Sequence, residues 1–194
     1  MSVTEIRVAG FGGQGVMLAA DIIGKAACIY AGGYATKTQN YGPEARGGAS
    51  SGALVLSKEP ILYPYTTSPH ILVALSQEAY SRFMPEMDPN GVLIVEEDLV
   101  PIGAELPSGV RVYRIPATRM AEELGRKIVM NVIVVGYFAA VSGILEKRAF
   151  LDSVTASVPE KALALNLRAF EAGYNYGRNV AVESAEPMAD AVER

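Results

Sequence analysis

A segment near the start of the chain has the residue types and spacing of an anion-binding turn. Gly10-Phe11-Gly12-Gly13-Gln14-Gly15 matches the pattern G-x-G-x-x-G, between a predicted strand at 5–9 and a predicted helix from Val16 to Tyr30. Glycines let backbone approach a ligand closely, and the free N–H groups at a helix start favour a negative charge. The candidates for contact with an anion or a cofactor are Gly10, Gly12, Gly13, Gln14 and Gly15.

This turn has three interpretations, which the sequence leaves open: tight packing of helix on sheet, contact with an anion or phosphate, and a dinucleotide site. A dinucleotide site also needs an acidic residue about twenty residues on, at the end of the second strand. The sequence has Ala35-Thr36-Lys37-Thr38-Gln39 there, in which Lys37 would suit the 2′-phosphate of NADP. A Walker A loop is excluded because no Lys-Ser/Thr pair follows Gly15.

A second segment with chemical potential covers residues 39–48. Gly42-Pro43 fixes a turn, and Gly47-Gly48 allows close backbone approach. Arg46 on such a loop suits recognition of a carboxylate or phosphate, and Tyr and Arg are common anchors of protein interfaces. The plain alternative is a solvated loop with an internal Glu44–Arg46 contact. The candidates for a surface facing a partner or a ligand are Gln39, Tyr41, Gly42, Pro43, Glu44, Arg46, Gly47 and Gly48.

Two polar residues elsewhere are candidates for lining a site. Gln77 follows a strongly apolar predicted strand, and ligands gather at the carboxyl ends of parallel strands. The plain alternative for Gln77 is a role at the start of the next helix. Asn131 lies in the uncharged stretch 128–145, where it needs buried hydrogen bonds that serve the fold or a neighbouring subunit.

The chain has few groups for catalysis or metal binding. It has one cysteine, Cys28, and one histidine, His70, so it forms no intrachain disulfide and no cysteine-rich zinc or iron–sulfur site. We expect Cys28 to be a buried residue of the first helix, and Glu96-Glu97-Asp98 to be a solvated loop. We therefore predict neither a catalytic residue nor a metal site in this chain.

The elements that position these residues alternate between strands and helices. This pattern predicts a single Rossmann-like α/β domain over residues 1–178, with three layers, a mostly parallel sheet and a helical C-terminal third. Asp21 and Lys25 are spaced for an ion pair along the first helix, and Gly177 should end the last one. Residues 179–194 are expected to be a disordered acidic tail. Further strands are predicted at 34–38, 51–57, 70–75, 92–95 and 110–115.

Composition excludes some classes of protein. The net charge is −4, with no basic cluster that would favour nucleic acid or anionic lipid. The uncharged stretch 128–145 includes Asn131 and two glycines, so we interpret it as a helix buried in the core and not as a membrane span. The first residues lack a signal-peptide pattern, which predicts a cytoplasmic protein.

Taken together, the segments at 10–15 and 41–48 resemble a known family. Gly-Phe-Gly-Gly-Gln-Gly followed by Tyr-Gly-Pro-Glu-Ala-Arg-Gly-Gly is similar to the gamma subunits of 2-oxoacid:ferredoxin oxidoreductases, within the pyruvate/ketoisovalerate group and nearest the 2-oxoglutarate type. The resemblance spans residues 5–177, and His70 departs from it because the family usually has Asp there. Further matches are residues 71–80 and 115–118, Asn131, Asn166, Ala169, Phe170 and Gly173.

This resemblance implies a supporting subunit of an enzyme. Such enzymes convert a 2-oxoacid, coenzyme A and oxidised ferredoxin to an acyl-CoA (succinyl-CoA for the 2-oxoglutarate type), carbon dioxide and reduced ferredoxin. Thiamine diphosphate, Mg²⁺ and iron–sulfur clusters belong to the alpha and beta partners, and a ferredoxin-like delta subunit is left open. The gamma chain would lie on the coenzyme A side, hold no cofactor alone and be inactive alone. The alternatives left open are a stand-alone NAD(P)- or CoA-binding Rossmann-like protein and, for the isolated chain, a homodimer.

Overall fold

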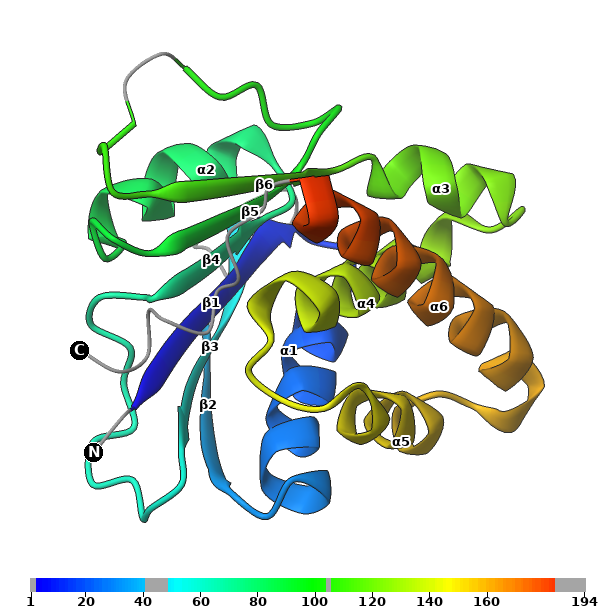
Figure 1. The fold of residues 1–194 in the computed structure, drawn as a ribbon, viewed down its shortest axis with the longest axis horizontal. Coiled ribbons are helices and arrows are strands. Elements are labelled where there is room, and N and C mark those ends of the chain that lie inside the picture. The colour runs from blue at the N-terminus through cyan, green and yellow to red at the C-terminus, as the bar shows by residue number, and fades with distance from the viewer. Residues whose placement is uncertain (1–2, 41–48, 104–105, 184–194) are drawn as a thin grey trace.

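The structure is a computed structural model that describes residues 3–40, 49–103 and 106–183, arranged in three layers (Figure 1). The central layer in this part of the chain is a six-stranded sheet with the order β2-β3-β1-β4-β5-β6. β3 pairs antiparallel with both of its neighbours, and the remaining pairs are parallel, so only β3 runs against the other strands. The predicted mostly parallel sheet is confirmed. The strands are β1 (Thr4–Phe11), β2 (Tyr34–Asn40), β3 (Ala49–Ser57), β4 (Ile71–Ala74), β5 (Val92–Glu96) and β6 (Arg111–Ile115).

Helices cover both faces of the sheet, and the predicted helical C-terminal third is confirmed (Figure 1). One face carries α2 (Gln77–Phe83), which a 3₁₀ turn, Met84–Glu86, extends. The other face carries α1 (Val16–Lys25), which continues as a π-helical turn, Ala26–Tyr30, and the C-terminal helices. These are α3 (Ala117–Glu123), a 3₁₀ turn (Lys127–Val129), α4 (Met130–Ser142), α5 (Lys147–Ser157) and α6 (Glu160–Glu183).

The sheet core is apolar on both faces because its central strands lie between helices. Every residue of β4 and β5 is buried, which explains their continuous apolar sequences. Side chains alternate between the two faces, so Val73 joins the core beneath α1 and α4, whereas Leu72 joins a smaller cluster with Phe83 of α2.

The centre of the helical layer is a close crossing of α4 and α6. α4 is buried along nearly its whole length, which confirms the predicted core helix. A Cβ on Gly136 would collide with the Phe170 carbonyl oxygen, and a Cβ on Gly173 would collide with the Ile133 carbonyl oxygen. The two backbones therefore pack directly on each other. Across the described parts of the chain, no helix has the length and apolar character needed to cross a membrane.

Predictions for several local features are wrong. Asp21 pairs with Lys37 of β2 instead of Lys25, because β2 passes beside α1 and Lys25 donates to Ser157 Oγ at 3.1 Å. Gly177 does not end α6, which runs to Glu183, because Gly177 packs closely against α4. Residues 179–183 are thus helical, and the rest of the expected tail lies outside the described residues.

Cys28 is exposed and not buried. The change from α-helical to π-helical geometry at Ala26 adds a residue to the turn and rotates the following side chains. Ala26 and Ala27 remain buried, whereas Ile29 is 62% exposed. The apolar sequence of this helix therefore does not continue as a buried stripe to its end.

Candidate functional site

The glycine turn lies at the carboxyl end of β1, where the chain enters α1. Gly13 and Gly15 have positive φ angles of 95° and 72°, which glycine adopts at little cost. Among the described residues other than the immediate chain neighbours, no heavy atom lies within 4 Å of the position that a Cβ would take on Gly12 or on Gly13, and both glycines are exposed. The outer surface of the turn is therefore open to a ligand or a partner.

Gln14 braces this turn from inside. Its Oε1 accepts a hydrogen bond from the Phe11 N–H at 2.6 Å, and its Nε2 donates to the Leu75 carbonyl oxygen at 2.8 Å. The Leu75 N–H in turn donates to the Ala9 carbonyl oxygen at 2.8 Å, so the ends of β1 and β4 are held together. The Gln14 carboxamide is committed to the turn, and its role is to position the backbone around the open glycines.

Asn131, at the start of α4, supports the same turn from the helical layer. It is 3% exposed, and its Nδ2 donates to the Gly15 carbonyl oxygen at 3.3 Å. A Cβ on Gly15 would collide with the Asn131 side chain. The buried hydrogen bond expected for Asn131 therefore exists, and it joins two motifs that lie far apart in the sequence.

The chain enters the segment 41–48 from β2 and leaves it into β3, and β3 pairs with β1 next to the glycine turn. In the sheet, Asn40 pairs with Ser51 and Ser50 pairs with Gly10, and Ser50 Oγ donates to the Gly10 carbonyl oxygen at 3.3 Å. Gln39 is exposed near the end of β2. The remaining predicted loop residues, Tyr41, Gly42, Pro43, Glu44, Arg46, Gly47 and Gly48, lie outside the described residues.

Gln77 is the first residue of α2 and follows the carboxyl end of β4. Ser76 caps this helix by accepting a hydrogen bond from the Ala79 N–H at 3.2 Å, and Gln77 itself is exposed. The described candidates at 10–15, 39, 77 and 131 thus lie at one end of the sheet, formed by the carboxyl ends of β1, β2 and β4. Ligand sites of α/β proteins commonly form at such an edge.

The interpretation of the turn as a dinucleotide site is not supported. A dinucleotide fold places the second strand next to the first, so that its end reaches the ribose. Here β3 separates β2 from β1, and the ammonium of Lys37 is paired with Asp21. The end of β2 is therefore one strand further from the glycine turn than a dinucleotide site requires, and Lys37, the only cationic residue of β2, is already paired.

Sequence reasoning missed two residues near this edge. Phe11 is 41% exposed at the tip of β1. A bulky apolar residue between glycines could have predicted this exposure. Glu96 was expected in a solvated loop but is the last residue of β5 and is fully buried. Its carboxylate accepts hydrogen bonds from the Leu99 N–H at 2.8 Å and the Thr118 N–H at 3.0 Å. It therefore links β5 to the start of α3.

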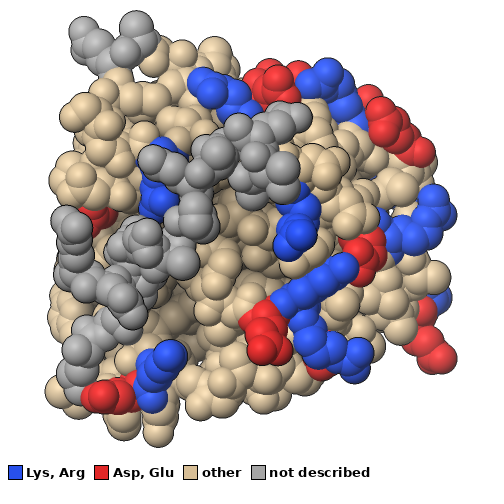
Figure 2. Space-filling model, in the orientation of Figure 1, with Lys and Arg blue, Asp and Glu red and all other residues tan. Residues whose placement is uncertain are grey.

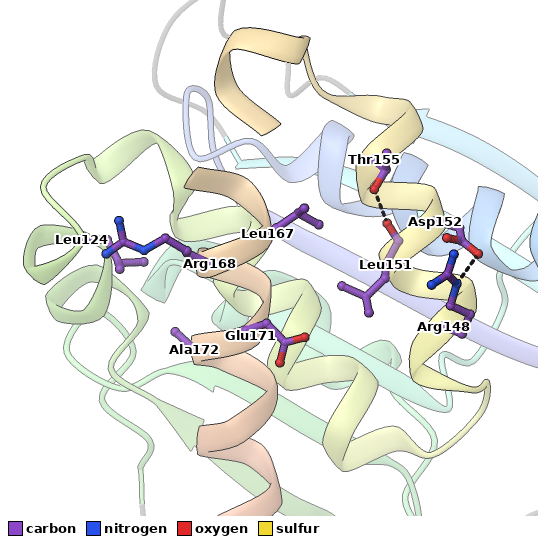
Figure 3. A pocket seen from close by; sticks show the side chains of 9 residues that line it. All are labelled: Leu124, Arg148, Leu151, Asp152, Thr155, Leu167, Arg168, Glu171 and Ala172. Atoms are coloured by element: carbon purple, nitrogen blue, oxygen red, sulfur yellow. Dashed lines mark hydrogen bonds and ion pairs between the residues drawn. The ribbon is translucent and has the colours of Figure 1, made fainter. Parts of the chain in front are cut away.

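A hollow lies in the helical layer, between α5 and α6, with a volume of about 740 Å³ (Figure 3). Leu151 and Leu167 line it, beside an Arg148–Asp152 ion pair at 2.9 Å. It shares no residue with the edge that holds the predicted site. On the face seen in Figure 2, acidic and basic side chains alternate over the side of α3, α5 and α6, so no surface of one sign forms there.

Replacing Gln14 tests its bracing role. We expect Gln14→Ala to lower the free energy of unfolding by about 1–3 kcal/mol, because the half-buried Leu75 carbonyl oxygen and the exposed Phe11 N–H both lose a partner. Gln77→Ala, an exposed glutamine at the same edge, should change it by less than about 0.5 kcal/mol. Urea unfolding of both variants measures the difference, and equal effects would mean that Gln14 does not brace the turn.

Comparison with known proteins agrees with this fold. The pyruvate ferredoxin/flavodoxin oxidoreductase family matches residues 5–176, and the chain belongs to this family. It is 47% identical over 175 residues to the 2-oxoglutarate synthase subunit KorC of Methanothermobacter thermautotrophicus, covering 87% of this chain and 92% of that one. The solved gamma subunit of a keto/oxoacid ferredoxin oxidoreductase from Geobacter sulfurreducens superposes with a TM-score of 0.81 at 36% identity, covering 91% of this chain and 97% of that one.

A further relative is longer. The ketoisovalerate oxidoreductase subunit VorA of Methanothermobacter thermautotrophicus is 31% identical over 178 residues, which cover 90% of this chain but 36% of VorA. In VorA a domain of this kind is therefore one part of a larger polypeptide.

Proposed function

We propose that this chain is the gamma subunit of a 2-oxoglutarate:ferredoxin oxidoreductase. The complex oxidises 2-oxoglutarate in the presence of coenzyme A, releases carbon dioxide, forms succinyl-CoA and passes the electrons to ferredoxin. The observation that carries this proposal is the 47% identity to a 2-oxoglutarate synthase subunit over nearly the full length of both chains. The stand-alone NAD(P)-binding alternative has no comparable support, because β3 separates β2 from the glycine turn.

The chemistry of the reaction assigns the reactive centres to other subunits. An acyl carbanion equivalent needs an electron sink such as thiamine diphosphate, and single-electron transfer needs iron–sulfur clusters with several thiolate ligands. This chain has one cysteine and one histidine. We therefore place thiamine diphosphate, Mg²⁺ and the clusters on alpha and beta subunits, leave a ferredoxin-like delta subunit open, and expect the isolated chain to be inactive.

Coenzyme A is the ligand that the glycine edge suits best. Its phosphates are anions, and the start of α1 presents backbone N–H groups beside the open surface of Gly12 and Gly13. Arg46 belongs to the segment between β2 and β3, two strands that lie on one side of β1, and we propose that its guanidinium supplies a positive charge to this ligand. The chain would thus help to enclose coenzyme A while partner subunits perform the oxidation.

The greater length of VorA supports assembly of this chain with other subunits. A domain that occupies 36% of one relative stands as nearly the whole of another, the 2-oxoglutarate synthase subunit. In the longer polypeptide, other regions are joined covalently to this domain. A separate gamma chain must instead contact its partner subunits through its surface. The cytoplasmic location stays a prediction from the sequence.

Arg46 provides the test of the coenzyme A side. We expect Arg46→Ala to fold normally and either to recover less of the larger subunits in a tagged copurification or to raise the KM for coenzyme A about 10- to 100-fold. That range corresponds to the loss of a charged hydrogen bond, about 1.5–3 kcal/mol. The matched control is Arg126→Ala, an exposed arginine in the segment between α3 and α4, which should copurify and turn over like the parent.

Two results separate the possible failures. If the parent chain brings down no larger subunit from its native source, the assignment to the complex is wrong. If the parent assembles and Arg46→Ala assembles and turns over equally well, the role given to the loop is wrong and the assignment stands.

A further inference from the structure

The outer edge of β2 is an unprotected sheet edge. β2 ends the strand order, and its ladder to β3 runs unbroken from Tyr34 opposite Ser57 to Asn40 opposite Ser51. In the described part of the chain, no strand pairs with its other side. Its sequence, Tyr-Ala-Thr-Lys-Thr-Gln-Asn, has no proline and no bulge. Native proteins normally protect such edges with charge, proline or bulges, because an open edge pairs readily with another strand.

The opposite edge of the same sheet shows the contrast. β6 is five residues long and carries two arginines, Arg111 and Arg114. β2 is longer, and its single charged residue, Lys37, forms an ion pair with Asp21 of α1. Charge therefore protects the β6 edge but leaves the β2 edge open.

We propose that two copies of this chain pair through their β2 strands, antiparallel about a two-fold axis at Lys37. The sequence around this point, Thr36-Lys37-Thr38, reads the same in both directions. The axis therefore places Thr36 of one copy opposite Thr38 of the other, twice, and threonine pairs across antiparallel strands are favourable. The pairing is isologous, as in most homodimers, and joins the two sheets into one.

The charges at the axis are balanced. Lys37 would lie opposite Lys37 of the second copy, and like charges directly opposite each other destabilise a strand pair. Each lysine, however, arrives with its own Asp21, so the four charges sum to zero. The Lys37 ammonium of one copy can then be attracted to the Asp21 carboxylate of the other.

The helices leave room for this pairing. α1 packs over β1, β3 and β2, which centres it on β3. In the paired arrangement β3 and its counterpart would be three strand spacings apart, about 14 Å. A helix with its side chains is about 10–12 Å in diameter, so the two α1 helices can lie side by side across the axis.

Exposed apolar side chains border this edge on both faces of the sheet. On the face that carries α1, Ile29 and Tyr30 are exposed at the end of the π-helical turn, which packs against β2. Tyr34, 46% exposed, lies on the other face together with Thr36, because side chains two residues apart on a strand share a face. There Thr36 Oγ1 donates to the Pro64 carbonyl oxygen at 3.2 Å, which holds the segment with the exposed Tyr63 and Tyr65 against β2. Aromatic residues are enriched in protein interfaces, so a strand partner at β2 finds apolar surface on either side.

Light scattering on the purified full chain tests the proposal independently of the proposed function. The parent at micromolar concentration should have twice the 20.6 kDa mass of one chain. An acidic variant, Thr36→Glu with Thr38→Glu, and a basic variant, Thr36→Lys with Thr38→Lys, should each be monomeric, because like charges face each other across the axis. An equal mixture of the two should recover the dimer mass, because every Glu then faces a Lys.

The control is Arg114→Glu on the β6 edge, which should stay dimeric, and circular dichroism should confirm that all variants are folded. A monomeric parent would overturn the proposal, including the case in which β2 accepts only an extended segment of a different subunit. Dimeric acidic or basic variants would overturn it as well. So would a mixture of folded variants that stays monomeric, because the register about Lys37 requires the charges to meet.

Discussion

Gly173→Ala should destabilise the protein by more than about 4 kcal/mol, or prevent it from folding. In an exposed helix the same change is favourable by about 1 kcal/mol, because alanine has the higher helix propensity. Here the added methyl group would collide with the Ile133 carbonyl oxygen of α4, so the two helices must separate along a crossing that is the centre of the helical layer. The clash is with backbone atoms, so no flexible side chain can move aside to relieve the overpacking.

Urea unfolding, or the soluble yield where the variant does not fold, measures this effect. Gly103→Ala is the matched control, because no heavy atom of the described residues beyond its chain neighbours lies within 4 Å of its Cβ position, and it should shift the free energy of unfolding by less than about 0.5 kcal/mol. Gly136→Ala, on the opposing helix, should behave like Gly173→Ala because its methyl group would meet the Phe170 carbonyl oxygen. If Gly173→Ala unfolds within about 1 kcal/mol of the parent, the helices are not packed as described.

Glu96→Ala should lower the free energy of unfolding by about 2–4 kcal/mol. The carboxylate is fully buried and accepts hydrogen bonds from the Leu99 and Thr118 N–H groups, so its removal leaves two backbone donors without partners. Hydrogen bonds to a charged group contribute about 1.5–3 kcal/mol each, and removal of the buried charge itself offsets part of that sum. Glu96→Gln should be intermediate, because its amide oxygen keeps one of the two bonds while its NH₂ group faces the other donor.

The next residue in the sequence provides the control. Glu97 is exposed and pairs with Arg119 at 3.4 Å, and an exposed ion pair contributes about 0–1 kcal/mol. Glu97→Ala should therefore change the free energy of unfolding by less than about 1 kcal/mol. If thermal and urea unfolding give the same small loss for both alanine variants, Glu96 does not hold α3 to β5.

Local signals explain which elements the sequence predicts well. The glycine turn follows a strand and opens a helix, and Gln77 begins the helix expected after its strand, because both features depend on residues a few positions apart. The strand order depends on pairings between distant segments and cannot be read from such signals. The main feature that the sequence could not predict is the position of the antiparallel strand β3 between β1 and β2.

The same distinction applies to the site. A buried asparagine such as Asn131 predicts that a hydrogen-bond partner exists, but its partner, Gly15, is 116 residues away in the sequence. The adjacent acidic residues 96–98 suggest a solvated loop, but Glu96 is the last residue of β5. The predicted boundary between strand and loop is therefore one residue too early. Gly177 resembles a helix stop, whereas its lack of a side chain serves the contact with Tyr137 and Ala140 of α4.

Reconstitution of the complex from purified subunits tests the central claim most directly. Reduction of ferredoxin is followed by absorbance with 2-oxoglutarate and coenzyme A as substrates, for the larger subunits alone, for this chain alone and for the mixture. We expect no turnover from this chain alone, and a rate for the larger subunits alone at least about tenfold below that of the mixture, a loss equivalent to about 1.4 kcal/mol of transition-state stabilisation. Turnover by the isolated chain, or full activity of the larger subunits without it, would contradict the account.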